Sequence, residues 1–68
     1  MTRPYEDQLP EGATVVGWNE KWVVWKDFVG FIPERPYTAH PVKNGRISGS
    51  GDHALTAAEA TELTGIPL

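Results

Sequence analysis

The sequence predicts a mainly β fold of the α+β class: a small antiparallel sheet or partly open barrel of two hairpins plus a third strand, with one short C-terminal helix. Three observations predict it. β-Branched and aromatic residues flank a short polar break within residues 13–26, Asn44-Gly45 stands between apolar residues, and a capping-box pattern begins at Thr56.

The length of the chain predicts one small domain. It has 68 residues and no cysteine, and a domain of this size buries only about 60% of the surface that its unfolded chain exposes. Without disulfides or thiolate metal sites, apolar packing or a partner must supply the stability. We expect an irregular N-terminal arm over residues 1–12 and a single domain over residues 13–68, β-rich at 13–48, with a Ser/Gly linker at 48–51 and a helix at about 57–64.

The first hairpin surrounds the polar break at residues 19–21, and two registers remain open. A two-residue turn at Asn19-Glu20 places Trp25 opposite Thr14. A three-residue loop places Trp18 opposite Trp22, and it is favoured because glutamate adopts positive φ poorly. In either register Trp22 and Trp25 point to opposite faces, because side chains alternate along a strand.

A third strand is predicted over residues 27–32, with Gly30 as a bulge or a site of close backbone approach. The second hairpin turns at Asn44-Gly45, since both residues tolerate the positive φ of a type I′ turn. This turn places Val42 opposite Ile47 and Lys43 opposite Arg46, which makes the tip an electropositive point on an acidic protein.

The C-terminal helix is predicted to start after Thr56, whose hydroxyl would accept from the amide of Glu59 while the Glu59 carboxylate reaches back. Gly65 is well placed to end it. A helix of two turns is not stable alone. We therefore expect Leu63 to dock on the sheet, together with Leu55 and Ile66 at the two ends.

Residues 55–67 resemble the first helix and turn of helix-turn-helix domains of the excisionase and MerR type. In that family a recognition helix follows the turn and enters the major groove. The sequence ends at Leu68, before such a helix, so we expect no reading of DNA by this segment.

The run Trp22-Val-Val-Trp25, followed by Gly30-Phe-Ile-Pro33 and Tyr37, resembles the back half of an SH3 domain. The resemblance implies an SH3-like barrel with a groove for proline-rich peptides, lined by Trp22 or Trp25, Pro33 and Tyr37. It covers residues 22–37 only. The sequence departs from the pattern at Tyr37, which stands one position late and lacks the usual preceding Asn.

Charge and hydropathy exclude several function classes. The net charge of −3 argues against nucleic acid as the partner, because domains that neutralise phosphates usually carry a basic face. No apolar run approaches the roughly 18 residues of a membrane span. The N-terminus has no apolar signal-peptide core, so we expect no membrane association and a cytoplasmic protein. Few Lys and Ile residues indicate a GC-rich genome.

The residues that could carry catalysis are few. His40 and His53 are the only histidines, both expected near loops and exposed to solvent, and with Asp52 they fall short of a structural zinc set. Ser48 and Ser50 are explained by the linker. We expect no enzyme, no catalytic residue, no metal and no cofactor.

Seven aromatic side chains exceed what so small a core needs, and Trp, Tyr and Arg dominate binding hot spots. We therefore expect a non-enzymatic accessory or regulatory protein, of phage or mobile-element origin, that binds a larger protein through an aromatic patch. Trp18 and Trp25, sharing a face in the two-residue register, would be the anchors. The alternatives are a homo-oligomeric structural subunit, or binding of a small ligand or single-stranded nucleic acid on the aromatic face. The candidate partner-binding residues are Trp18, Trp22, Trp25, Phe28, Tyr37, Lys43 and Arg46.

Overall fold

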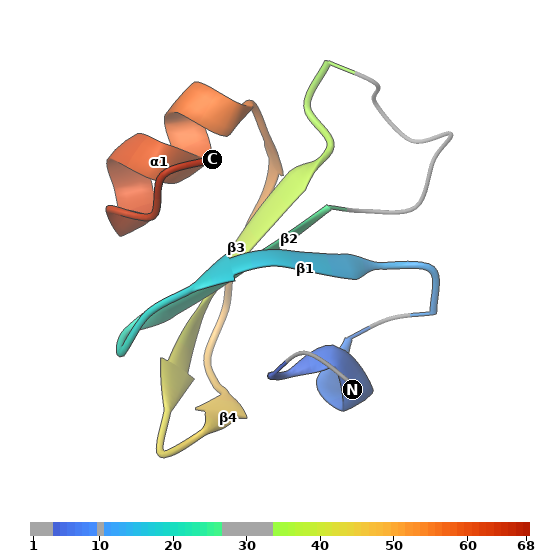
Figure 1. Ribbon diagram of the computed structural model, residues 1–68, viewed down its shortest axis with the longest axis vertical. Coiled ribbons are helices and arrows are strands. Elements are labelled where there is room, and N and C mark those ends of the chain that lie inside the picture. Colours follow the sequence, from blue (N-terminus) through green and yellow to red (C-terminus); the bar gives the residue numbers. More distant parts are fainter. Residues whose placement is uncertain (1–3, 10, 27–33) are drawn as a thin grey trace.

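Antiparallel strands build most of the structure, a computed structural model that describes residues 4–9, 11–26 and 34–68. The fold is mainly β, as predicted: four to five strands form a curled half-barrel sheet with one short C-terminal helix (Figure 1). The elements are the 3-10 turn η1 (Glu6–Gln8), β1 (Thr14–Trp18), β2 (Trp22–Lys26), β3 (Tyr37–Lys43), β4 (Arg46–Ile47), β5 (Asp52–Leu55) and α1 (Ala57–Thr64).

Strand β3 is the centre of the sheet. The strand order is β1-β2-β3-β4, and β5 also pairs with β3. Along one edge, β3 pairs with β2 over residues 37–41; along the other it pairs with β5 at its beginning and with β4 at its end. The predicted third strand at residues 27–32, with Gly30, lies outside the described residues.

The register of the first hairpin differs from both predictions near the turn, but beyond Val16 it is the register that the three-residue loop predicts. Trp18 lies opposite Val23, whereas beyond an irregularity at Val16 the next pair joins Val15 to Trp25. Val16 is therefore the extra residue of a β-bulge, which changes the phase of the strand.

The side chain of Asn19 explains this turn. Its Oδ1 accepts hydrogen bonds from the backbone N–H groups of Lys21, at 2.8 Å, and Trp22, at 2.7 Å. The Asn19 N–H in turn donates to the Trp22 carbonyl oxygen at 2.8 Å. An Asx-type turn of this kind mimics a backbone turn, so the chain reverses between Asn19 and Trp22 rather than at Asn19-Glu20.

Both faces of the sheet are covered. On one face, Val24 and Ala39 pack with Ala60 and Ile66 of the C-terminal segment. The other face holds a cluster of Val15, Val23, Trp25 and Val42, against which Tyr5 and Leu9 of the N-terminal arm pack. Figure 1 shows α1 and the arm on opposite sides of the strands. Trp22 packs against the first cluster and Trp25 belongs to the second, which confirms that they lie on opposite faces.

The second hairpin has the predicted geometry. Val42 pairs with Ile47 and Lys43 with Arg46, and the turn residues Asn44 and Gly45 have φ values of 54° and 78°, as a type I′ turn requires. The arm is fixed to this hairpin by Gln8. Its Nε2 donates to the Gly45 carbonyl oxygen at 3.2 Å, and its Oε1 accepts from the Ile47 N–H at 2.9 Å.

Helix α1 starts and ends where the sequence predicts, with the capping box at Thr56 and Gly65 at φ 77° after its last residue. The prediction that Leu63 docks on the sheet is wrong, since Leu63 is 40% exposed. Ala60 and Thr64 are buried in its place, one helical turn apart on the same face. The Thr64 hydroxyl donates to the Ala60 carbonyl oxygen at 2.7 Å and accepts from the Ile66 N–H at 3.1 Å, so its burial leaves the hydroxyl bonded.

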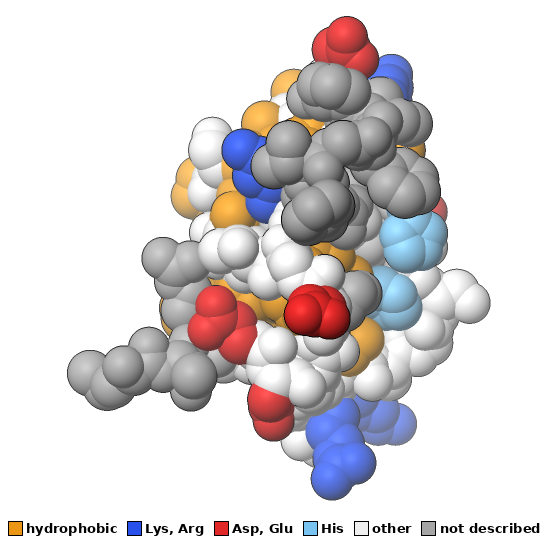
Figure 2. Space-filling model, turned by 90° about the vertical axis from the view of Figure 1, so that its right-hand side faces the viewer, with side chains coloured by type: hydrophobic (Ala, Val, Ile, Leu, Met, Phe, Trp, Pro, Cys, Tyr) orange, Lys and Arg blue, Asp and Glu red, His pale blue; other side chains and the backbone are white. Residues whose placement is uncertain are grey.

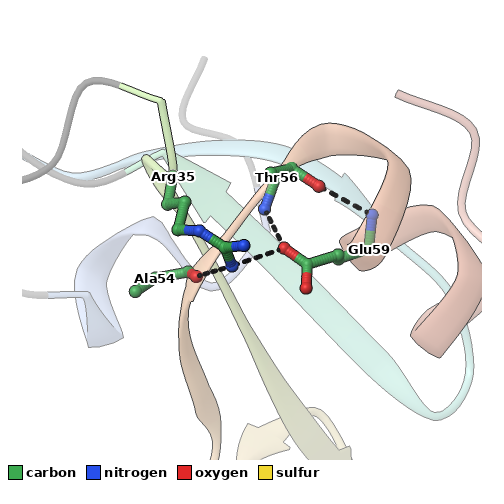
Figure 3. A network of polar contacts seen from close by, with 4 residues as sticks. All are labelled: Arg35, Ala54, Thr56 and Glu59. Carbon is green, nitrogen blue, oxygen red and sulfur yellow. Dashed lines mark hydrogen bonds and ion pairs between the residues drawn. The ribbon is translucent and has the colours of Figure 1, made fainter.

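A polar network joins the start of α1 to the segment before β3 (Figure 3). The Glu59 carboxylate accepts from the Thr56 N–H at 3.0 Å and from Arg35 at 2.7 Å, and the same Arg35 nitrogen donates to the Ala54 carbonyl oxygen at 3.2 Å. The hydrogen bond from the Thr56 backbone, helped by the charge of Arg35, lowers the pKa of Glu59 against the desolvation that raises it. The ionised carboxylate therefore stabilises the folded state.

We predict that the stability lost in Glu59→Gln depends on pH. Because the folded pKa lies below the unfolded value of about 4.5, the advantage of the wild type is fully present above that pH and is lost as the pH falls through the folded pKa. Urea unfolding between pH 7 and pH 3 measures it, with Glu62→Gln on the same helix as the control. A wild-type advantage that stays constant over this range contradicts the prediction.

Candidate functional site

The sheet divides the predicted aromatic patch between its two faces. Trp22 and Tyr37 pack against the cluster under α1. Trp18 pairs with Val23, and cross-strand neighbours point to the same side, so Trp18 shares the opposite face with Trp25. Phe28 lies outside the described residues. The described aromatic residues therefore do not form one continuous surface.

Trp25 is a core residue. It is 4% exposed, and its ring stacks on His40 with the ring centroids 5.4 Å apart and the planes at 11°. A side chain this buried offers a partner little surface, so the role of Trp25 is to fill the face of the sheet that the arm covers.

Trp18, unlike Trp25, is exposed to solvent. It ends β1, the outermost strand of the sheet path, and is 48% exposed. Val16 and Leu68 are also exposed, and Leu68 lies beside Gly17, where an added Cβ would be 3.6 Å from its Cδ2. Val16, Trp18 and Leu68 are thus exposed around β1, with Trp18 on the face of Trp25 and Leu68 on the α1 face beside Gly17, and we call them the apolar edge. The charged residues of the adjoining turn, Glu20 and Lys21, are exposed next to it.

The two basic candidates lie at the tip of the second hairpin. Lys43 and Arg46 are exposed and directly opposite each other. Figure 2 shows Lys and Arg side chains gathered at the end of the molecule that carries this hairpin. Like charges held opposite one another repel, and an acidic group placed between them would relieve the repulsion.

The histidines form an arrangement that sequence reasoning missed. His40 lies half-buried in β3 rather than exposed in a loop, and the exposed His53 of β5 meets its ring edge-on, with the centroids 6.2 Å apart. The Nδ1 of His53 lies 3.3 Å from the Thr38 hydroxyl oxygen. The alternation of Thr38, His40 and Val42 could have placed His40 on the sheet. No sequence signal indicated that residues 52–55 pair with β3.

Gly51 allows this arrangement. A Cβ added there would overlap the His40 ring and lie 2.6 Å from the Ala39 carbonyl oxygen. The Ser48 N–H donates to the Pro41 carbonyl oxygen at 2.9 Å. The Ser/Gly segment therefore runs closely along β3.

Within the described ranges, no group of three or more His, Cys, Asp or Glu residues could hold a metal ion. None of the helices in these ranges combines the length and the apolar character needed to span a membrane.

We predict that Gly51→Ala destabilises the domain by about 1–3 kcal/mol, the usual cost of forcing a methyl group into a packed site. The neighbouring exposed Ser50→Ala serves as the control and should change the free energy of unfolding little. Both values come from urea unfolding followed by circular dichroism. Equal stabilities of the two variants would show that Gly51 is not closely packed.

Comparison with protein-family models, with curated protein sequences and with solved structures finds no match to this chain.

Proposed function

We propose that this protein is a small, non-enzymatic accessory or regulatory domain that binds a larger protein through the apolar edge, with Trp18 as the anchor. The observation that carries the proposal is the exposure of Trp18, 48% on the outermost strand of the sheet path. Burying a side chain of this size on a partner provides a large apolar area, and Trp is enriched among the residues that dominate binding energy.

The surroundings of Trp18 support this assignment. The exposed Val16 of the same strand adds apolar surface, and the exposed Glu20 and Lys21 of the turn supply charged groups at the border. An apolar centre with a polar rim is the usual composition of a protein interface. Lys43 and Arg46 at the hairpin tip would orient an acidic partner by long-range attraction, which raises the rate of association more than the affinity.

We predict that Trp18→Ala weakens partner binding by at least about 2 kcal/mol, or roughly 30-fold in Kd, while the domain stays folded. The matched control is Leu63→Ala, which removes a comparably exposed apolar side chain, 40% exposed in α1. The two variants and the wild type serve as bait in lysate of the source cell, and the affinity for the recovered protein is then measured. A stoichiometric partner retained by Leu63→Ala and lost by Trp18→Ala supports the proposal. Equal retention by both variants contradicts it.

Self-association is the second candidate, and the composition of β1 favours it. The strand is Thr-Val-Val-Gly-Trp, without the charged or proline residues that usually protect the outer strand of a sheet from pairing with another chain. Because β1 carries no charge, a second copy could approach it without like-charge repulsion, despite the net charge of −3.

For this candidate we predict a dimer that Val16→Lys converts to a monomer, since the substitution places like charges at an interface between copies. Analytical ultracentrifugation of the purified chain, over a range of concentrations, gives the mass. Glu20→Lys, in the adjoining turn, is the control for added positive charge. A wild-type protein that is monomeric at all concentrations excludes self-association and leaves the larger partner.

A further inference from the structure

The turn of the second hairpin presents an asparagine whose side chain is not held by the rest of the fold. Asn44 is exposed, and none of the hydrogen bonds of the described residues involves its side-chain amide. The next residue is Gly45, whose N–H donates no hydrogen bond within the part of the chain that the structure describes. Nothing lies within 4 Å of the place where a Cβ of Gly45 would stand. The Asn44 side-chain carbonyl carbon and the Gly45 nitrogen are therefore free to react with each other.

The other asparagine of the chain, Asn19, is held at both atoms of its amide. Its Oδ1 accepts from the N–H groups of Lys21 at 2.8 Å and Trp22 at 2.7 Å. Its Nδ2 donates to the Thr64 carbonyl oxygen at 2.9 Å. The residue that follows it is Glu20, whose Cβ restricts the backbone more than a glycine does. Asn19 is thus an internal reference for the reactivity of an asparagine that the fold restrains.

An unrestrained asparagine side chain before glycine is set up for an intramolecular reaction. Attack by the Gly45 nitrogen on the Asn44 Cγ closes a five-membered ring, and two groups joined through so few bonds meet at a high effective concentration. Glycine rotates easily into the backbone angles that the ring requires. The end of the hairpin can open for this, because β4 pairs with β3 at only two positions and such short pairing opens locally at low cost.

We propose that Asn44 is a site of spontaneous deamidation, which places a carboxylate at the basic tip of the second hairpin. The Gly45 nitrogen attacks the Asn44 Cγ, so that the N–Cγ bond forms and the Cγ–Nδ2 bond breaks. Ammonia leaves with the proton that the Gly45 nitrogen gives up. Water then opens the cyclic imide, adding its hydroxyl group to one carbonyl carbon and its proton to the ring nitrogen. Addition at Cγ gives aspartate and addition at the backbone carbon gives isoaspartate, and nothing is oxidised or reduced.

Either product changes the charge of the tip. The new carboxylate follows Lys43 in the chain and precedes Arg46, the residue that Lys43 faces across the turn, so attraction offsets part of their repulsion. One negative charge is added to the net charge of −3. The modified tip attracts an acidic partner less, and this consequence alone rests on the function proposed above. The reaction itself needs no partner.

Isoaspartate also changes the backbone, because the chain then runs through the former side chain of Asn44 and gains one atom. A type I′ turn joins its two strands at a fixed length, so the added atom displaces the turn. Gln8 holds the arm through the Gly45 carbonyl oxygen at 3.2 Å and the Ile47 N–H at 2.9 Å. We therefore expect the isoaspartate product to hold the arm less firmly than the aspartate product does.

Incubation of the folded wild-type protein at pH 8 tests the proposal. Ion-exchange chromatography separates the more acidic product, and mass spectrometry of its peptides detects the gain of about 1 Da that accompanies conversion of an amide to a carboxyl group. We expect this gain at Asn44 at least about tenfold faster than at Asn19, whose hydrogen bonds must break first. Equal rates at the two residues, or no modification at Asn44, overturn the proposal.

Asn44→Gly is the matched control, because glycine adopts the positive φ of the turn and has no amide to lose. Its chromatogram should stay unchanged under the same incubation. Asn44→Asp supplies the aspartate product directly, since Asp-Gly also suits a type I′ turn, and it should elute with one of the products of the wild type. An acidic product that forms from Asn44→Gly as fast as from the wild type overturns the proposal.

Discussion

The fold depends on the burial of both faces of β2 and β3. Val23 and Trp25 point to one side and Val24 to the other, and all three are nearly inaccessible to solvent. A sheet that is apolar on both sides needs a cover on each. With 68 residues, the covers come from the two ends of the chain: the arm around Tyr5 and Leu9 on one face, and α1 with Ile66 on the other.

Because the apolar core is divided into two thin clusters, polar contacts are also needed to hold the arm and α1 against the sheet. Gln8 fixes the arm to the second hairpin, and Arg35 with Glu59 fixes the start of α1. The end of α1 is held by the Asn19 side chain, which donates to the Thr64 carbonyl oxygen at 2.9 Å. Each contact joins segments that are far apart in the sequence. Neither cover could form alone, since an isolated helix of two turns is unstable, so the ends of the chain and the sheet must order together.

Features set by local chemistry could be predicted from the sequence. The Asn44-Gly45 turn and the capping box from Thr56 to Glu59 require only residues within a few positions of each other, and the structure confirms both predictions. Strand β5 could not be predicted in this way. Its pairing comes from β3, Ala54 has a conformation that alanine seldom adopts, and the close passage that Gly51 permits beside His40 involves a residue from another strand.

In the candidate site, the position of Trp18 likewise could not be predicted from the sequence alone. Alternation correctly separates Trp22 from Trp25, because both lie on one regular strand. The position of Trp18 relative to them depends on the bulge at Val16 and on the Asx-type turn at Asn19, neither of which the hydrophobic pattern reveals. Both features shift the pairing by one residue, and a shift of one residue exchanges the faces of a strand. Trp18 thus lies on the same face as the buried Trp25, but at the outermost strand, where the arm-side cluster ends and the ring remains exposed to solvent.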